Sequence, residues 1–307
     1  WIMGLVGRIT HDSEWGIRLT ALLLGTMSLF LLHRFAEKLF GPRAALLALL
    51  LGALTPANAL LNLVLTIDAP LVLCWSAALL AFWNALEQPG RTSRWVLLSV
   101  ILGLGHLSKQ MMLVFPLLMI LHCAFNPASR PVLRRPAFWI CIMVSLLFLA
   151  PVVWWNAGHD WVTLKHTSHH FKTKENAGLL DHLGTFGTFL GLQALAFSPL
   201  TWLLMIAAVF GGWWKWRLLD EKERYAVMFS GPGLAVFAML SLRQNVNVNW
   251  PGVFYLSATA LAGAWLDQTA LGVLPWHKLR GWKRPALVLG VVASLLACVL
   301  PGREQAA

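Results

Sequence analysis

The chain has 307 residues, of which 58% are hydrophobic and only 12% are charged, and its formal net charge is +11. Because a soluble globular domain carries about 25% charged residues, this composition excludes a soluble protein and predicts an integral membrane protein. The apolar runs are continuous and do not alternate, which excludes a transmembrane β-barrel. In a soluble protein this positive charge would suggest binding to nucleic acid. In a membrane protein the lysines and arginines are instead distributed between the loops of the two faces, and we expect no nucleic-acid partner.

Ten apolar runs follow one another along the chain, several of them close to the ~20 residues that a helix needs to cross a bilayer. They predict an all-α, polytopic transmembrane bundle of about ten helices that forms a single domain over residues 1–307. The seventh run is long enough to tilt or to break near Ser198 and Pro199. Residues 156–182, the longest polar stretch, are expected to form an external loop with a short helix. The runs are 19–32, 44–65, 71–86, 95–107, 111–125, 136–155, 183–214, 225–242, 250–266 and 286–300.

The lysines and arginines are distributed unevenly between the two predicted faces. Sixteen of the 24 lie in five alternate loops, and the other eight lie on the opposite side. Since cytoplasmic loops of membrane proteins carry an excess of these residues, the five loops are predicted to be cytoplasmic. We expect a multi-pass protein of the bacterial inner membrane, with its other face toward the periplasm. The five basic loops are 33–43, 87–94, 126–136, 215–224 and 268–284.

The remaining polar residues gather on the predicted external face. Nothing in the alternation of the loops requires this, so it suggests one external site assembled from several loops. The members of this group are Asp68, Lys109, His159, Asp160, His166, His169, His170, Arg243 and Asn249.

Asp68 is the catalytic candidate, because it is a carboxylate between two apolar runs. A charge at mid-bilayer costs about 3 kcal/mol on insertion scales, so Asp68 should lie at an interface or in a watered cavity. There it could bind a metal or orient a hydroxyl nucleophile. The alternative is a helix N-cap, which an Asp shortly before Pro70 would also suit.

Two cations on the same face could bind a phosphate. Lys109 lies between two apolar runs, and the following helix could assist it in holding an anion. The alternative for Lys109 is a lysine that snorkels to the headgroups. Arg243 precedes a loop that contains Asn249 and Trp250, and Arg243 and the amides could bind phosphate or sugar hydroxyls. The alternative for this loop is a simple interfacial tryptophan anchor.

The stretch after residue 154 is the densest polar cluster. His159 and Asp160 are expected to line a substrate site. His166 and His170 are four residues apart, which puts them on one helical face, where they could hold a divalent metal with Asp68 as a third ligand. The alternative is a wet amphipathic helix lying on the membrane, since the pair lacks the glutamate of a zincin motif.

Five short stretches resemble motifs of one family. Residues 66–70 (TIDAP) are similar to its T-P-D-A-P stretch, and residues 11–19 (HDSEWGIRL) to its G-D-S-E-F-x-x-R-L. Residues 103–109 (GLGHLSK), 155–161 (WNAGHDW) and 249–251 (NWP) also match, in the same order. The chain therefore resembles glycosyltransferase family 39, bacterial relatives of the protein O-mannosyltransferases and of the lipid A aminoarabinose transferase, within the glycosyltransferase-C superfamily.

This resemblance implies an inverting transfer of a sugar from a polyprenyl-phosphate carrier to a lipid, glycan or protein acceptor outside the membrane. It implies that Asp68 occupies the family's second acidic position, that Lys109 meets the carrier phosphate, and that His170 lies near a metal. Ile67 replaces the family's proline, which leaves the backbone of Asp68 less constrained. The family's first acidic motif, its main base, would precede Trp1. We therefore expect that a first transmembrane helix and most of the first external loop are missing, and that residues 1–307 alone do not catalyse transfer.

A transporter or flippase for a lipid-linked substrate is the alternative from another class. Such a protein needs polar residues at mid-membrane and often shows inverted repeats. The chain has His106 and His122 inside apolar runs, but we find neither a repeat nor a chain of acids and bases across the runs. The polar groups cluster at one face, which favours an enzyme.

Overall fold

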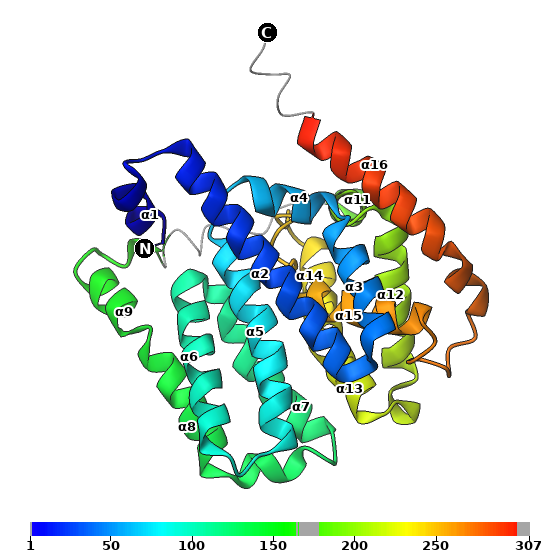
Figure 1. Ribbon diagram of the computed structural model, residues 1–307, viewed down its shortest axis with the longest axis horizontal. Helices are drawn as coiled ribbons and strands as arrows, with labels where there is room; N and C mark the ends of the chain where they lie inside the picture. The colour runs from blue at the N-terminus through cyan, green and yellow to red at the C-terminus, as the bar shows by residue number, and fades with distance from the viewer. Residues whose placement is uncertain (1, 164, 166–177, 300–307) are drawn as a thin grey trace.

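The computed structural model describes residues 2–163, 165 and 178–299, and this part of the chain is built of helices and turns without a strand (Figure 1). The predicted all-α class is therefore confirmed. The longer helices of the first half lie side by side, and the second half packs beside them (Figure 1).

Each predicted apolar run is helical, and several runs are divided into two helices. The first half contains α1 (Ile2–Thr10), α2 (Glu14–Phe40), α3 (Pro42–Ala53), α4 (Pro56–Leu63), α5 (Asp68–Glu87), α6 (Thr92–Ser108), α7 (Val114–Phe125), α8 (Pro136–Leu147) and α9 (Ala150–Ala157). The second half contains α11 (Leu179–Ala196), α12 (Pro199–Trp214), α13 (Glu221–Met228), α14 (Gly231–Ser241), α15 (Phe254–Leu266) and α16 (Lys283–Val299). Short 3₁₀ helices cover Gln110–Leu113, Arg130–Arg134, Trp216–Leu218 and His277–Trp282.

By length and composition, four helical segments of the described chain can cross a membrane: Glu14–Phe40, Asp68–Glu87, Pro136–Ala157 and His277–Val299. The pairs α3–α4 and α11–α12 raise the number to six if each bent pair is one span. Segments Gln110–Phe125 and Phe254–Leu266 are apolar but shorter. The chain is thus a multi-pass membrane protein, and the number of ten crossings stays a prediction.

The breaks between paired helices have local causes. The α11–α12 pair turns by 109° at Ser198, whose backbone lies in the left-handed region (φ 63°), and Pro199 then begins α12. This confirms the predicted break at Ser198 and Pro199. The α3–α4 pair bends by 69°, where Pro56 begins α4 and Thr55 caps it by accepting a hydrogen bond from the Asn58 amide. These bends matter because both lie beside the functional site.

Helix α15 lies in the interior of the second half (Figure 1). Twelve of its 13 residues are buried, so it is apolar around its whole circumference, as a core helix must be. It packs closely on α3, because a Cβ atom added at Gly263 would lie 2.7 Å from the carbonyl oxygen of Ala44 and 2.7 Å from the amide nitrogen of Ala48. Glycine is therefore required at 263 for these two backbones to approach.

Contacts in series join the five basic loops at the end of the bundle where α5 finishes. Lys38 Nζ lies 2.9 Å from a carboxylate oxygen of Glu87, which joins the first loop to the second. The Arg135 guanidinium lies beside Gly90, which joins the second to the third. The third, fourth and fifth loops are joined by hydrogen bonds of the Ser129 hydroxyl to Glu221 and of the Leu271 amide to Glu223. The alternation inferred from the sequence thus brings all five loops to one end.

Candidate active site at the opposite end of the bundle

A carboxylate with two donors forms the centre of the candidate site. Asp68 begins α5, about 30 Å along the helix from Glu87. Lys109 Nζ donates to Asp68 Oδ1 at 2.6 Å, and Asn249 Nδ2 donates to Asp68 Oδ2 at 2.8 Å. The side chains of Asp68 and Lys109 are only 17% and 16% exposed. Three segments that are far apart in the sequence therefore meet at one partly buried point, which we call the Asp68 cluster (Asp68, Lys109 and Asn249).

Local backbone structure places each member of the cluster. Helix α6 ends at Ser108, and Lys109 is extended (φ −159°, ψ 142°) before the next 3₁₀ helix begins. Asn249 lies in the turns before α15, where its carbonyl accepts from the Gly252 amide at 3.2 Å. Gln193 of α11 fixes the same loop by donating to the Val248 carbonyl at 3.0 Å. The three side chains thus project from helix ends and anchored turns.

The structure decides between the alternatives for Asp68 and Lys109. Asp68 is the first residue of α5, the N-cap position is Ile67, and the Asp68 carboxylate bonds to Lys109 and Asn249. A capping role alone is therefore wrong. Lys109 does not extend to headgroups either, because its ammonium group is paired and mostly buried.

The charges of the cluster cancel within it, since one ammonium faces one carboxylate. An arriving phosphate would compete with Asp68 for Lys109, and a charge-assisted hydrogen bond is about twice as strong as a neutral one. Arg243 is exposed, six residues before Asn249 in the same connection, and makes no ion pair with any described residue. Arg243 is thus a second cation near this end, outside the cluster itself.

His159 and Asp160 are not brought into the cluster. Both are exposed in the turn that follows α9, and α9 lies at the edge of the bundle (Figure 1). The His159 ring stacks on Trp155 with centroids 4.2 Å apart. Within the described ranges, no hydrogen bond or ion pair joins either residue to Asp68, Lys109 or Asn249. Their role in lining a substrate site stays a prediction.

The proposed metal ligands His166 and His170 lie outside the described residues. In the part of the chain that the structure describes, no group of three His, Cys, Asp or Glu side chains is close enough to hold a metal ion. Both oxygens of Asp68 accept hydrogen bonds from nitrogen donors. A divalent cation would need these same oxygens as its ligands. These surroundings do not fit a metal on Asp68 in this arrangement.

A cavity of about 450 Å³ adjoins Asp68 and Asn249. Its walls are mostly apolar and come from α2, the bend between α3 and α4, the bend between α11 and α12, and the start of α15. Besides Asp68 and Asn249, the polar side chains that line it are Ser28, Thr55, Asn58, Thr66, Tyr255 and Thr259. This cavity was not predicted from the sequence, although the amides of Asn58 and Asn62 within the apolar run 44–65 could have indicated it. The arrangement can accept a ligand with a long apolar part and a charged end.

The fold and the site together define a multi-pass membrane protein with a charged cluster at the end of the bundle opposite its basic loops. Residues 1–155 match the family model described as dolichyl-phosphate-mannose-protein mannosyltransferase. The chain belongs to this family, which confirms the resemblance seen in its motifs.

Two curated relatives extend the match beyond residue 155. Lipid A galacturonosyltransferase RgtD of Rhizobium johnstonii is 25% identical over 305 residues, covering 96% of this chain and 59% of the relative. The undecaprenyl phosphate-alpha-4-amino-4-deoxy-L-arabinose arabinosyl transferase of Pseudomonas paraeruginosa is 23% identical over 373 residues. This match covers 99% of this chain and 65% of the relative. The chain thus spans roughly six-tenths of the length of these relatives.

Solved structures show the same fold. ArnT from Cupriavidus metallidurans bound to undecaprenyl phosphate superposes with a TM-score of 0.65 at 16% identity, over 100% of this chain and 61% of that one. The apo structure of the same protein gives a TM-score of 0.62 at 18% identity, over 91% of this chain and 50% of that one. This likeness confirms the predicted glycosyltransferase-C type of bundle.

Proposed function

We propose that this protein is a membrane glycosyltransferase that moves a sugar from a polyprenyl-phosphate carrier to an acceptor, with inversion. The observation that carries the proposal is the Asp68 cluster, in which a partly buried ammonium and a carboxylate lie beside a largely apolar cavity. A polyprenyl phosphate combines the two matching features, an anionic head and a long apolar chain. Two relatives named as lipid A and undecaprenyl-phosphate sugar transferases support a lipid acceptor and this donor class.

The chemistry requires that an acceptor hydroxyl oxygen bonds to the anomeric carbon while the bond from that carbon to the carrier phosphate breaks. The phosphate leaves with the electron pair, and the hydroxyl proton passes to a base. Lys109 is suited to stabilise the leaving phosphate, with Arg243 as a second cation. When Lys109 turns to the phosphate, Asp68 Oδ1 becomes free to accept the hydrogen bond of the acceptor hydroxyl, while Asn249 continues to hold Oδ2. No step is assigned to a metal, because the contacts of Asp68 do not fit one.

The direction of the site follows from its place in the bundle. The five basic loops lie at the far end of α5 from Asp68, and such loops face the cytoplasm in most membrane proteins. We infer that the site faces the periplasm and that the protein resides in the bacterial inner membrane. Its partners would be the membrane lipids, the lipid-linked donor and the acceptor.

The test purifies residues 1–307 and an N-terminally extended form in detergent and supplies each with a radiolabelled undecaprenyl-phosphate sugar and lipid A. Transfer of the label to lipid A, with release of undecaprenyl phosphate, supports the proposal. Detergent removes the two compartments that a transporter or flippase requires, so a transporter gives no labelled product there. Movement of the labelled donor across sealed proteoliposomes without any transfer would instead establish the transporter.

A further inference from the structure

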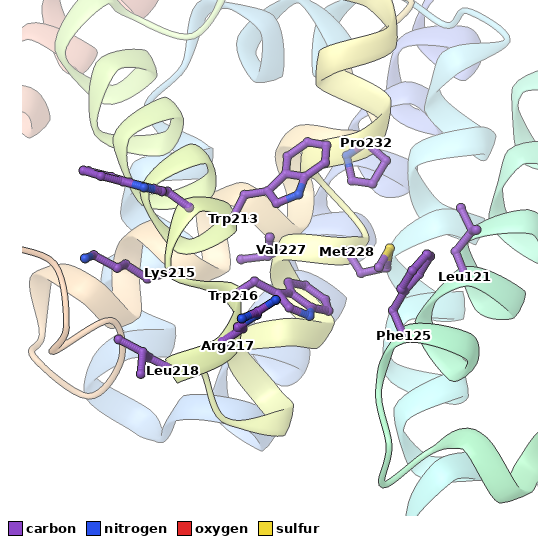
Figure 2. A pocket seen from close by; sticks show the side chains of 11 residues that line it. Leu121, Phe125, Trp213, Lys215, Trp216, Arg217, Leu218, Val227, Met228 and Pro232 are labelled. Atoms are coloured by element: carbon purple, nitrogen blue, oxygen red, sulfur yellow. The ribbon is translucent and has the colours of Figure 1, made fainter.

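A second and larger cavity lies at the basic end of the bundle, remote from the Asp68 cluster. It has a volume of about 630 Å³ and opens between α7, the end of α12, the 3₁₀ helix Trp216–Leu218 and α13. Figure 2 shows the rings of Trp213 and Trp216 on one side of this space and Phe125 and Leu121 on the other. We call it the tryptophan groove.

Among the residues that the structure describes, the charged side chains that line the tryptophan groove are two cations, Lys215 and Arg217. Arg217 lies beside Trp216 at one edge of the groove (Figure 2), and Lys215 Nζ lies 4.8 Å from the centroid of the Trp214 ring. Neither cation forms an ion pair with a described residue. The groove therefore combines an apolar interior with uncompensated positive charge at its rim.

The carboxylates that lie nearest to Lys215 and Arg217 in the sequence already accept hydrogen bonds from other groups. Asp220 and Glu223 form a reciprocal capping box at the start of α13, in which each side chain accepts from the other's backbone amide. Glu221 accepts a hydrogen bond from the Ser129 hydroxyl at 3.0 Å. The local positive charge is thus available to a ligand.

We propose that the tryptophan groove binds one anionic phospholipid of the cytoplasmic leaflet. The headgroup phosphate would meet Arg217 and Lys215, and an acyl chain would lie against Trp213, Trp216 and Phe125. Three features favour this occupant over a soluble one. The groove lies among the basic loops, which the proposed orientation places at the cytoplasmic surface, tryptophans concentrate at the membrane interface, and anionic lipids are enriched in the cytoplasmic leaflet. Phe125 and Trp214 are 61% and 71% exposed, which suits contact with lipid chains.

The experiment measures which lipids the protein retains. Protein is assembled in nanodiscs with equal parts of dioleoyl phosphatidylglycerol and dioleoyl phosphatidylcholine, and native mass spectrometry gives the ratio of the two lipids that stay bound. The test variant is K215Q/R217Q. The matched control is K222Q/K278Q, which removes two exposed cations from the same end without touching the groove. A second variant, Leu121→Trp, fills the groove and leaves its charges in place.

We expect the wild type to retain phosphatidylglycerol preferentially, and K215Q/R217Q to lower the bound ratio by about fivefold per cation removed. The control pair should retain the wild-type ratio, and Leu121→Trp should reduce the amount of lipid bound. Equal losses in the test and control pairs would show a general surface attraction and overturn the proposal. An unchanged amount of bound phosphatidylglycerol in Leu121→Trp, or no preference in the wild type, would overturn it too. Sugar transfer is not part of the readout, so the outcome is independent of the proposed transfer reaction and shares with the proposed function only the orientation of the bundle.

Discussion

Lys109 Nζ lies 2.6 Å from Asp68 Oδ1 across a separation of 41 residues, in a contact where both side chains are less than one-fifth exposed. Neither group is a surface ion, so each depends on the other for compensation. The pair also joins the start of α5 to the end of α6 at the end of the bundle that carries the site. A ligand that reaches Lys109 must therefore replace Asp68 as its partner, and this exchange underlies the first two predictions.

Asp68→Asn should lower sugar transfer by about 10²-fold or more while the protein remains folded, because the amide cannot take the acceptor's proton. The amide keeps the shape of the side chain and can still meet Asn249 or Lys109. Initial rates with labelled donor measure the effect, and a matched melting temperature establishes folding. Asp12→Asn, an exposed carboxylate outside the cluster, is the control and should retain full activity. Full activity of Asp68→Asn would restrict Asp68 to a structural role.

Lys109→Met should weaken donor binding more than acceptor binding. A charge-assisted hydrogen bond to phosphate contributes about 1.5–3 kcal/mol, so the donor KM should rise by about 10–100-fold. Steady-state kinetics with one substrate varied at a time separates the two constants. Lys109→Met also leaves Asp68 without its cation, so Lys109→Met/Asp68→Asn should recover stability but not donor affinity. A raised acceptor KM with an unchanged donor KM would reverse the assignment.

Gly263→Val should destabilise the bundle, because its Cβ would lie 2.7 Å from the backbone of Ala44 and of Ala48. Overpacking of this kind costs about 1–3 kcal/mol, and here the obstacle is backbone, which cannot rotate away. Gly187→Val in α11 is the matched control, since nothing lies within 4 Å of its added Cβ. Thermal unfolding in detergent should show a lower Tm for the first variant and little change for the second. Equal shifts in the Tm of the two variants would mean that the change in helix propensity from glycine to valine, and not close packing at Gly263, dominates the effect on stability.

Single cysteines should show which end of the bundle faces outward. In a background without native cysteines, Gln110→Cys and His159→Cys should react with an impermeant thiol reagent from outside intact cells, and Ser93→Cys should not. All three positions are exposed, so differences in labelling report on side and not on burial. Ser129, although it lies in a basic loop, is buried and bonded to Glu221, which makes it a poor probe. Labelling of Ser93→Cys from outside would invert the proposed orientation.

Much of this architecture could be predicted because the bilayer imposes simple rules on sequence. Apolar runs identified the helices, and alternation of their loops grouped Asp68, Lys109 and Asn249 on one face before any contact was known. The direct bonds of Lys109 and Asn249 to Asp68 could not be predicted, since loop alternation assigns a face but not a distance. His159 shares that face yet stacks on its neighbour Trp155. The cavity was missed because it depends on two sharp bends, and hydropathy does not encode the angle between successive helices.

Charged residues in the five basic loops have two roles, one in the direction of membrane insertion and one in the contacts between the loops of the folded protein. Lysines and arginines govern which way a membrane protein inserts, and carboxylates contribute little to that choice. Glu87, Glu221 and Glu223 instead receive donors from neighbouring loops and so connect finished helices. These carboxylates therefore contribute to the assembly of the loops while contributing little to the direction of insertion. Glu221→Ala should consequently lower the Tm, measured by thermal unfolding in detergent, without inverting the protein, which a topology reporter in residues 215–224 can establish.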